Sequence, residues 1–167
     1  SRWWVHGHKD PDTGQIASYS PMPQLVSLHA FCQVGLTNDH EFDVADCKNA
    51  FSQSDKLRRP RGRLFLEPCE GLPLAKGILI ELIVPVYGLD DAPLAWHYTI
   101  SNLLISKTMG YRRHVTDPCW FVKHQRGQLV GQVCVEVDDL LMSGDAEEMS
   151  SLRAVSYTHL RAHETTR

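Results

Sequence analysis

An acid pair inside an apolar run limits the folds open to this chain. Residues 133–142 read Val-Cys-Val-Glu-Val-Asp-Asp-Leu-Leu-Met, and their alternation predicts a strand that turns back as a hairpin at Asp138 and Asp139. Carboxylates are costly to remove from water, so such a pair binds a cation, pairs with basic side chains or points into solvent. A solvated turn is the ordinary explanation. Because apolar residues follow the pair at once, we favour a metal site.

The composition is that of a globular domain. The chain has 167 residues, 43% hydrophobic and 22% charged, and its net charge of -3 argues against a generally basic nucleic-acid binder. No apolar run reaches the length of a membrane span, so we expect no membrane partner. The five cysteines form no C-x-x-C pair, which indicates reduced thiols and an intracellular protein. The start lacks both an initiator Met and a signal-peptide pattern, which indicates a piece of something longer.

The C-terminal residues differ in character from what precedes them. Residues 155–165 lack an amphipathic period and resemble the in-frame translation of an adapter used in sequencing libraries. We therefore expect residues 1–154 to form the domain and residues 155–167 to be a non-native tail that packs on nothing. A genuine C-terminal helix is the alternative.

The remaining elements follow from periodicity. Leu25, Leu28, Cys32 and Leu36 recur at three- and four-residue intervals and predict a helix that turns this face to the core. A second helix is predicted from Pro93 to about residue 108. Strands are predicted at residues 41–47, 63–68, 78–84, 119–123 and 129–137. The pattern is that of an α+β fold with an antiparallel hairpin at its centre.

The strand predicted at residues 41–47 contains two candidate acids on opposite faces. Parity places Asp46 with Phe42 and Val44, at the end of what should be the buried face. Asp43 then lies on the side that reaches water. A desolvated carboxylate needs a cation, so this pattern favours Asp46 as the functional acid.

Five cations lie within eight positions shortly after this strand: Lys56, Arg58, Arg59, Arg61 and Arg63. Most charge runs are solvated loops. The density of this cluster in a net negative chain makes a loop that contacts nucleic-acid phosphates an equal alternative.

Three separated pieces together resemble the reverse transcriptase of copia-type LTR retrotransposons. They are residues 46–51 (Asp-Cys-Lys-Asn-Ala-Phe), residues 86–96 with Tyr87-Gly88-Leu89, Ala92-Pro93 and Trp96, and the run Val137-Asp138-Asp139. The resemblance covers nearly all of residues 1–149, in the expected order and spacing. It implies an α+β right-hand polymerase fold, with fingers and palm built on a central antiparallel sheet with packed helices and with the thumb missing.

The resemblance also implies a reaction and its catalytic groups. A primer 3′-hydroxyl attacks an α-phosphate while two divalent ions about 3.5–4 Å apart stabilise the attacking and leaving oxygens. Asp46, Asp138 and Asp139 take the role of the metal ligands. Hard carboxylate oxygens suit Mg²⁺, with Mn²⁺ as an alternative.

Four further residues match nucleotide-binding positions of this family. Phe51 matches the aromatic that lies under the incoming sugar and excludes a 2′-hydroxyl, and its alternative role is that of a core aromatic. Tyr87 and Gly88 match the segment that lies against the nucleotide and template. Arg2 matches the basic N-terminal residues that grip the triphosphate.

One departure from the family and one rival function remain open. Glu136 stands where many relatives have an aromatic or a histidine before the acid pair, and it adds a third acid to this strand face. The implied partners are an RNA or DNA template with its primer, a dNTP, and the thumb, ribonuclease H and integrase of a Pol polyprotein. The implied location is the cytoplasm, within virus-like particles. The rival is a decayed or repurposed copy that binds nucleic acid without catalysis.

Overall fold

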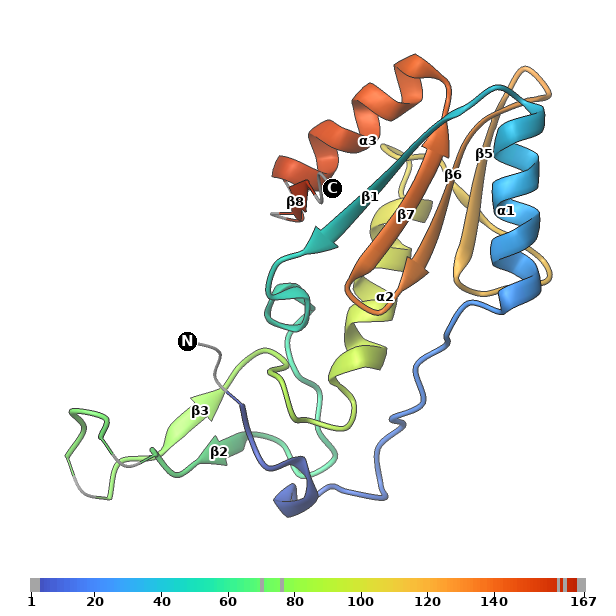
Figure 1. The fold of residues 1–167 in the computed structure, drawn as a ribbon. Helices are drawn as coiled ribbons and strands as arrows, with labels where there is room; N and C mark the ends of the chain where they lie inside the picture. The colour runs from blue at the N-terminus through green and yellow to red at the C-terminus, as the bar shows by residue number, and fades with distance from the viewer. Residues whose placement is uncertain (1–3, 70, 76, 159, 161, 165–167) are drawn as a thin grey trace.

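The strands predicted around the acid pair lie in the middle of a six-stranded antiparallel sheet. The computed structural model describes residues 4–69, 71–75, 77–158, 160 and 162–164, and gives the sheet order β4-β5-β6-β7-β1-β8 (Figure 1). These strands are β1 (Glu41–Cys47), β4 (Arg112–Arg113), β5 (Trp120–Gln125), β6 (Gln128–Glu136), β7 (Asp139–Gly144) and β8 (Ala162–Glu164). All neighbouring strands run antiparallel.

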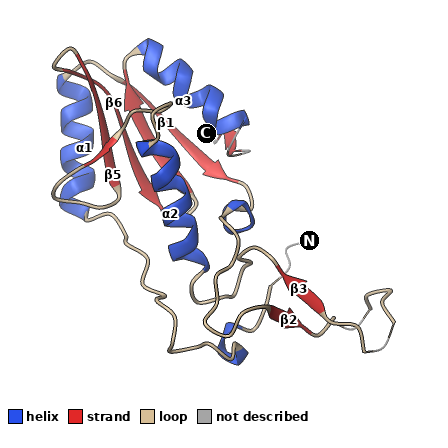
Figure 2. Ribbon diagram, turned by 180° about the vertical axis from the view of Figure 1, so that it is seen from behind, coloured by secondary structure: helices blue, strands red, loops and turns tan. Residues whose placement is uncertain are grey.

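Helices cover both faces of this sheet. Helix α1 (Leu25–Thr37) lies on one face, and α2 (Ala92–Ile105) lies on the other, where it is seen in front of the strands in Figure 2. Helix α3 (Ala146–Thr158) shares a core cluster with α2, so it lies on the same face. The predicted mixed α and β architecture with a central antiparallel sheet is thus confirmed.

Burial on both faces explains the unbroken apolar character of β6. Val133 and Val135 point into the larger core beneath α2 and α3, while Cys134 between them packs with Phe31 of α1. A strand covered on both faces needs apolar side chains at every position, not at alternate ones. The apolar run that stands out in the sequence therefore belongs to the two central strands of the sheet, β6 and β7.

Helix α1 packs through a different face from the one that the sequence predicted. Its buried residues are Ser27, Phe31 and Gly35, whereas Leu25 and Leu36 are 69% and 68% exposed. A Cβ on Gly35 would collide with the ring of Phe42. Small residues therefore let the helix backbone approach the sheet closely, and a search for large apolar side chains overlooks that stripe.

A second, smaller sheet projects away from the main body. It is the antiparallel pair β2 (Leu64–Leu66) and β3 (Ile80–Leu82), which lies well apart from the six-stranded sheet in Figure 1. The chain also forms two short 3₁₀ helices, η1 (Gly7–Lys9) before α1 and η2 (Ala50–Gln53) between β1 and β2. Both predicted strands of this hairpin form, though each is shorter than expected.

Part of the C-terminal region packs on the molecule, contrary to the sequence prediction. Ser156 and Leu160 are buried, and β8 pairs with β1. Ser156 lies four residues after buried Leu152, so the inward stripe of α3 continues past residue 154. The expectation that residues 155–167 pack on nothing is therefore wrong for these positions. Their adapter origin stays a prediction, and positions 159, 161 and 165–167 lie outside the described residues.

No helix in the described part of the chain has the length and apolar character that crossing a bilayer requires.

Gly88 allows the N-terminal segment to lie close to the loop that precedes α2. The amide of Val5 donates to the carbonyl of Tyr87 at 2.9 Å, and a Cβ on Gly88 would collide with the Val5 carbonyl. The φ angle of Gly88 is +97°, in the region that favours glycine. Two separate constraints therefore require glycine here.

We expect Gly88→Ala to destabilise the chain by more than the left-handed conformation alone costs, which is about 1–2 kcal/mol. The matched control is Gly127→Ala, because Gly127 has φ +81° but no atom within 4 Å of its added Cβ. Urea unfolding of both variants measures the difference. Equal losses of stability would contradict the close contact between Gly88 and the N-terminal segment.

Candidate functional site

The three candidate acids meet at one end of the sheet. Strands β6 and β7 form a hairpin in which Glu136 pairs with Asp139, leaving Val137 and Asp138 as a two-residue turn. On the other side of β7, strand β1 pairs Asp46 with Asp139. The fold thus brings Asp46, from a strand far earlier in the chain, next to the acid pair of the hairpin (Figure 1).

The hairpin turn has a conformation that its sequence does not favour. Val137 has φ +52°, whereas Asp138 is not among the residues with positive φ, and this combination is that of a type II′ turn. The first central position of such a turn favours glycine. A β-branched residue there is a conformational outlier, and the left-handed region costs about 1–2 kcal/mol for a residue with a Cβ. Contacts elsewhere in the fold must therefore hold the turn.

Two donors from different elements supply those contacts. The indole N–H of Trp96 in α2 donates to the carbonyl of Val137 at 2.6 Å. The amide of Cys47 at the end of β1 donates to the carbonyl of Asp138 at 2.8 Å. Both carbonyls of the turn are therefore fixed by residues outside the hairpin.

Negative charge accumulates at this end of the sheet. Burial, followed by repulsion from Asp138, Asp46 and Glu136, raises the pKa of Asp139 above its ordinary value. Burial together with Asp46, Asp138 and Asp139 raises the pKa of the Cys47 thiol to about 12, so this thiol stays neutral. None of the three aspartates forms an ion pair with a described residue. The cluster is an uncompensated negative centre that attracts cations.

The buried face of β1 is the opposite of the one that was predicted. Asp46 is exposed, together with Phe42 and Val44, and the buried side chains are those of Ala45 and Cys47. The small residues point into the larger core, so the argument that placed Asp46 on the buried face is wrong. Asp46 is accessible to a ligand from solvent.

Asp43 has a structural partner of its own. Its carboxylate accepts a hydrogen bond from Nε of Arg153 in α3 at 2.8 Å, and the same guanidinium lies 3.0 Å from Glu41. Asp43 therefore ties β1 to α3. It does not belong to the acid cluster at the hairpin turn.

A shallow pocket lies beside the cluster on the α1 face. It has a volume of about 290 Å³, and its lining residues are Leu28, Val44, Cys134, Glu136, Asp139 and Leu141. Two carboxylates on an otherwise apolar wall give a polar end and an apolar end to this pocket. Glu136 thus shares this pocket with Asp139, its partner across the hairpin, whereas the sequence predicted that it shares a strand face with Asp138.

The donor chemistry of the cluster fits a hard divalent cation, but the side chains as they lie do not close around one. Carboxylate oxygens without a basic partner are the donors that Mg²⁺ and Mn²⁺ favour. Within the residues that the structure describes, however, no group of three or more His, Cys, Asp or Glu side chains is arranged to hold a metal ion. Asp46 and Asp139 are exposed, so their carboxylates have room to rotate toward a bound ion.

Three of the four predicted nucleotide-binding residues lie in the part of the chain that the structure describes. The ring of Phe51 is 8% exposed and lies against the ring of Tyr87, with 4.6 Å between centroids. Gly88 approaches the backbone of Val5 closely, so its small size already has an explanation within the chain. Phe51, Tyr87 and Gly88 therefore lie together, with Phe51 in the core. Arg2 lies outside the described residues.

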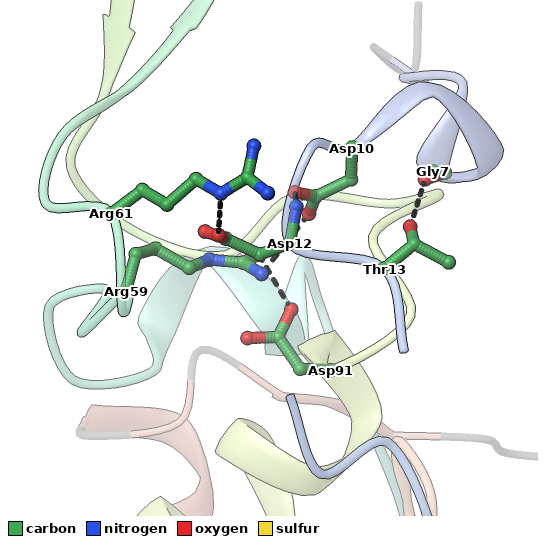
Figure 3. Close-up of polar contacts among 7 residues, drawn as sticks. All are labelled: Gly7, Asp10, Asp12, Thr13, Arg59, Arg61 and Asp91. Carbon is green, nitrogen blue, oxygen red and sulfur yellow. Dashed lines mark hydrogen bonds and ion pairs between the residues drawn. The ribbon is translucent and has the colours of Figure 1, made fainter. Parts of the chain in front are cut away.

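Arg59 does not belong to an exposed phosphate-binding loop. Its side chain is 1% exposed, with Nη1 3.0 Å from Asp10 and Nη2 donating to Asp91 at 2.8 Å (Figure 3). Arg61 is more exposed and its Nε lies 3.5 Å from buried Asp12. The network joins the N-terminal loop, the basic segment and the start of α2. A buried charge without its partner is strongly destabilising, so Arg59 stabilises the fold through these ion pairs and is not available to bind phosphate.

The other basic residues of this segment differ in whether a carboxylate is paired with them. Arg63 forms a bidentate pair with Glu81 across the β2–β3 hairpin, with both contacts at 2.7 Å. Lys56 and Arg58 are exposed and form no ion pair among the described residues. The predicted five-residue basic surface is thus reduced to Lys56 and Arg58, with Arg61 and Arg63 at its edge.

Sequence reasoning missed two features of this region. The acidic partners of Arg59 lie in loops far from it along the chain, and no local pattern indicates them. Trp96 was noted only as part of a motif, although a buried tryptophan has an N–H that needs an acceptor. That requirement is the one signal that could have indicated its contact with the hairpin.

Two relatives from Arabidopsis thaliana are similar to this chain. They are the retrovirus-related Pol polyproteins from transposons RE1 and RE2, which are 27% and 25% identical to it over 138 residues. The aligned region covers 81% of this chain but only 9% of each relative, so the chain spans a small part of their length. No family model and no solved structure matches the chain. The chain is thus similar to one region of these two retrotransposon Pol polyproteins.

Proposed function

We propose that this chain is the fingers and palm portion of an RNA-directed DNA polymerase, the reverse transcriptase of a copia-type LTR retrotransposon. The observation that carries the proposal is the pairing of Asp46 with Asp139 across β1 and β7, with Asp138 in the adjoining turn. The similarity to retrotransposon Pol polyproteins supports the same origin. The antiparallel sheet between helices suits a polymerase palm, and the projecting β2–β3 hairpin suits part of the fingers.

The chemistry of the proposed reaction explains why the acids are needed together. A primer 3′-hydroxyl attacks the α-phosphate of a dNTP, a new phosphodiester bond forms, and pyrophosphate leaves. Two bound Mg²⁺ ions, or Mn²⁺ in their place, would stabilise the attacking and leaving oxygens. Asp46, Asp138 and Asp139 would hold these ions through carboxylate oxygens. The contribution of the fold is to place three acids, from β1 and from the β6–β7 hairpin, where no described basic side chain forms an ion pair with them.

The substrates and partners of this proposal follow from the same site. The exposed side chains of Lys56 and Arg58 provide positive charge for the phosphates of a template–primer duplex. Phe51 and Tyr87, in ring contact, would lie near the incoming dNTP, with Phe51 as the group that excludes a 2′-hydroxyl. The chain would work with the thumb, ribonuclease H and integrase of a Pol polyprotein, in the cytoplasm and within virus-like particles.

A second candidate function is nucleic-acid binding without catalysis, as in a decayed or repurposed copy. Two observations favour it: the described acids do not close around a metal ion, and Glu136 adds repulsion to the cluster. Both candidates predict binding of a primer–template duplex. They differ in magnesium-dependent primer extension.

We expect Asp139→Asn to lower magnesium-dependent primer extension by about a thousandfold, because bound metal supplies several kcal/mol of transition-state stabilisation. The assay uses a Pol protein that carries this chain and a defined RNA template with a DNA primer. Asp43→Asn is the matched control, since it changes the same group on the same sheet but breaks only a partly exposed ion pair with Arg153. Asp43→Asn should keep most of the activity. Equal activity of the two variants would contradict the polymerase assignment.

Metal binding should weaken as the pH falls through the raised pKa of Asp139, because the protonated acid is a poor ligand. Glu136 is one of the charges that raise this pKa, so Glu136→Gln should lower it and move the loss of Mn²⁺ affinity to a lower pH. Glu147→Gln removes the same charge from an exposed position in the first turn of α3 and serves as the control. Mn²⁺ titrations followed by electron paramagnetic resonance measure both midpoints. An unchanged midpoint in Glu136→Gln would show that this acid does not act on the site.

A further inference from the structure

A two-residue hairpin turn such as the one that carries Asp138 can take either of two conformations, type I′ or type II′. Types I′ and II′ differ by rotation of the peptide group between the two central residues, here the peptide that joins Val137 to Asp138. The carbonyl of Val137 belongs to that peptide, so whatever binds it selects one turn type. The observed angles, with φ +52° at Val137 and no positive φ at Asp138, correspond to type II′.

Trp96 is the residue that binds this carbonyl. Its indole N–H donates to the Val137 oxygen at 2.6 Å, and Trp96 itself is only 1% exposed. The backbone of the next residue is fixed as well, since the Cys47 amide donates to the Asp138 carbonyl at 2.8 Å. The Cys47 bond ties the turn to β1, whereas the Trp96 bond determines how the central peptide is oriented.

The orientation of that peptide affects the direction of the Asp138 side chain. Rotating it changes ψ of Val137 and φ of Asp138 together, and it moves the amide nitrogen of Asp138, which tilts the Cα–Cβ bond of that residue. Valine favours neither form, because both have positive φ at the first central position and a β-branched residue avoids positive φ. Without the indole bond the turn has no described side-chain partner that selects type II′. The acids would then sample more than one arrangement.

We propose that Trp96 is a positioning residue for the acid cluster, which keeps the turn in the type II′ form and thereby orients Asp138 toward a divalent cation that Asp139 also binds. The inference rests on the proposed polymerase function, because it assumes that these acids bind metal. Trp96 itself touches neither substrate nor metal in this account. It acts through the backbone of the hairpin.

Mn²⁺ binding to the isolated chain tests this role without an activity assay. Trp96→Phe keeps an aromatic ring in the core but removes the donor. Its matched control is Trp120→Phe, because Trp120 is also buried and donates its indole N–H, at 3.2 Å, to Gln132 in the middle of β6, not to the turn. Both variants lose a buried indole bond and some stability. Only Trp96→Phe should weaken Mn²⁺ binding, by roughly tenfold, the loss typical of residues that orient metal ligands.

Nuclear magnetic resonance gives a second readout that does not depend on a variant folding. In the unaltered chain labelled with ¹⁵N, adding Mg²⁺ should shift the indole N–H resonance of Trp96 and leave that of Trp120 in place. In Trp96→Phe, the amide signals of Asp138 and Asp139 should broaden, because the turn then exchanges between two forms. An indole resonance of Trp96 that does not respond to Mg²⁺ would overturn the inference.

Asp139→Asn separates the failure of this inference from that of the proposed function. If Asp139→Asn abolishes Mn²⁺ binding but Trp96→Phe and Trp120→Phe both bind within twofold of the unaltered chain, the metal site stands and the role of Trp96 is refuted. If Asp139→Asn binds Mn²⁺ as the unaltered chain does, the proposed metal site fails and the inference fails with it.

Discussion

The pairing of β1 with β7 is the interaction on which the site depends. It places Asp46 opposite Asp139 and, through the amide of Cys47, it also fixes the backbone of Asp138. The side chains of a strand alternate between its two faces, so a slip of one residue in this register would move Asp46 to the other face of the sheet. The buried residues Ala45 and Cys47 prevent that slip, because both must remain in the core.

The acid cluster works against the stability of the fold that carries it. Asp139 has a raised pKa because burial and three neighbouring acids disfavour its charge. A carboxylate of this kind contributes stability below the pKa of the unfolded chain and loses that contribution as the pH rises through its folded value. At neutral pH the charged cluster is therefore unfavourable until a cation binds. Such a balance is expected of a functional site, where fixed charges of one sign are kept for a ligand.

The central hairpin and its acids could be predicted from the sequence, because those predictions depend on the local alternation of apolar and polar residues. The elements around residues 92–105 and 41–47 were likewise placed from nearby residues. The buried face of α1 could not be predicted, since Gly35 packs through the absence of a side chain. The orientation of Asp46 was mispredicted because small residues, not large ones, fill the core side of β1.

Contacts between distant segments account for the rest of what the sequence did not reveal. Arg59 is bound by Asp10 and Asp91, so a cation that reads as a phosphate ligand in the sequence serves to hold the N-terminal loop and the start of α2. Trp96 reaches the hairpin from a different helix. Local patterns predict which groups are present, but the fold decides which of them neutralise one another. Asp46, Asp138 and Asp139 are among the charged groups that it leaves without a counter-charge from a described residue.

The proposed function requires that acids from β1 and from the β6–β7 turn form one divalent-cation site. Crystals of the chain soaked in Mn²⁺, with diffraction data collected at the manganese absorption edge, test it directly. We expect an anomalous peak bound by carboxylate oxygens of Asp46 and of Asp138 or Asp139. An anomalous map in which the metal lies elsewhere, or in which these three side chains stay unbound at saturating Mn²⁺, would contradict it.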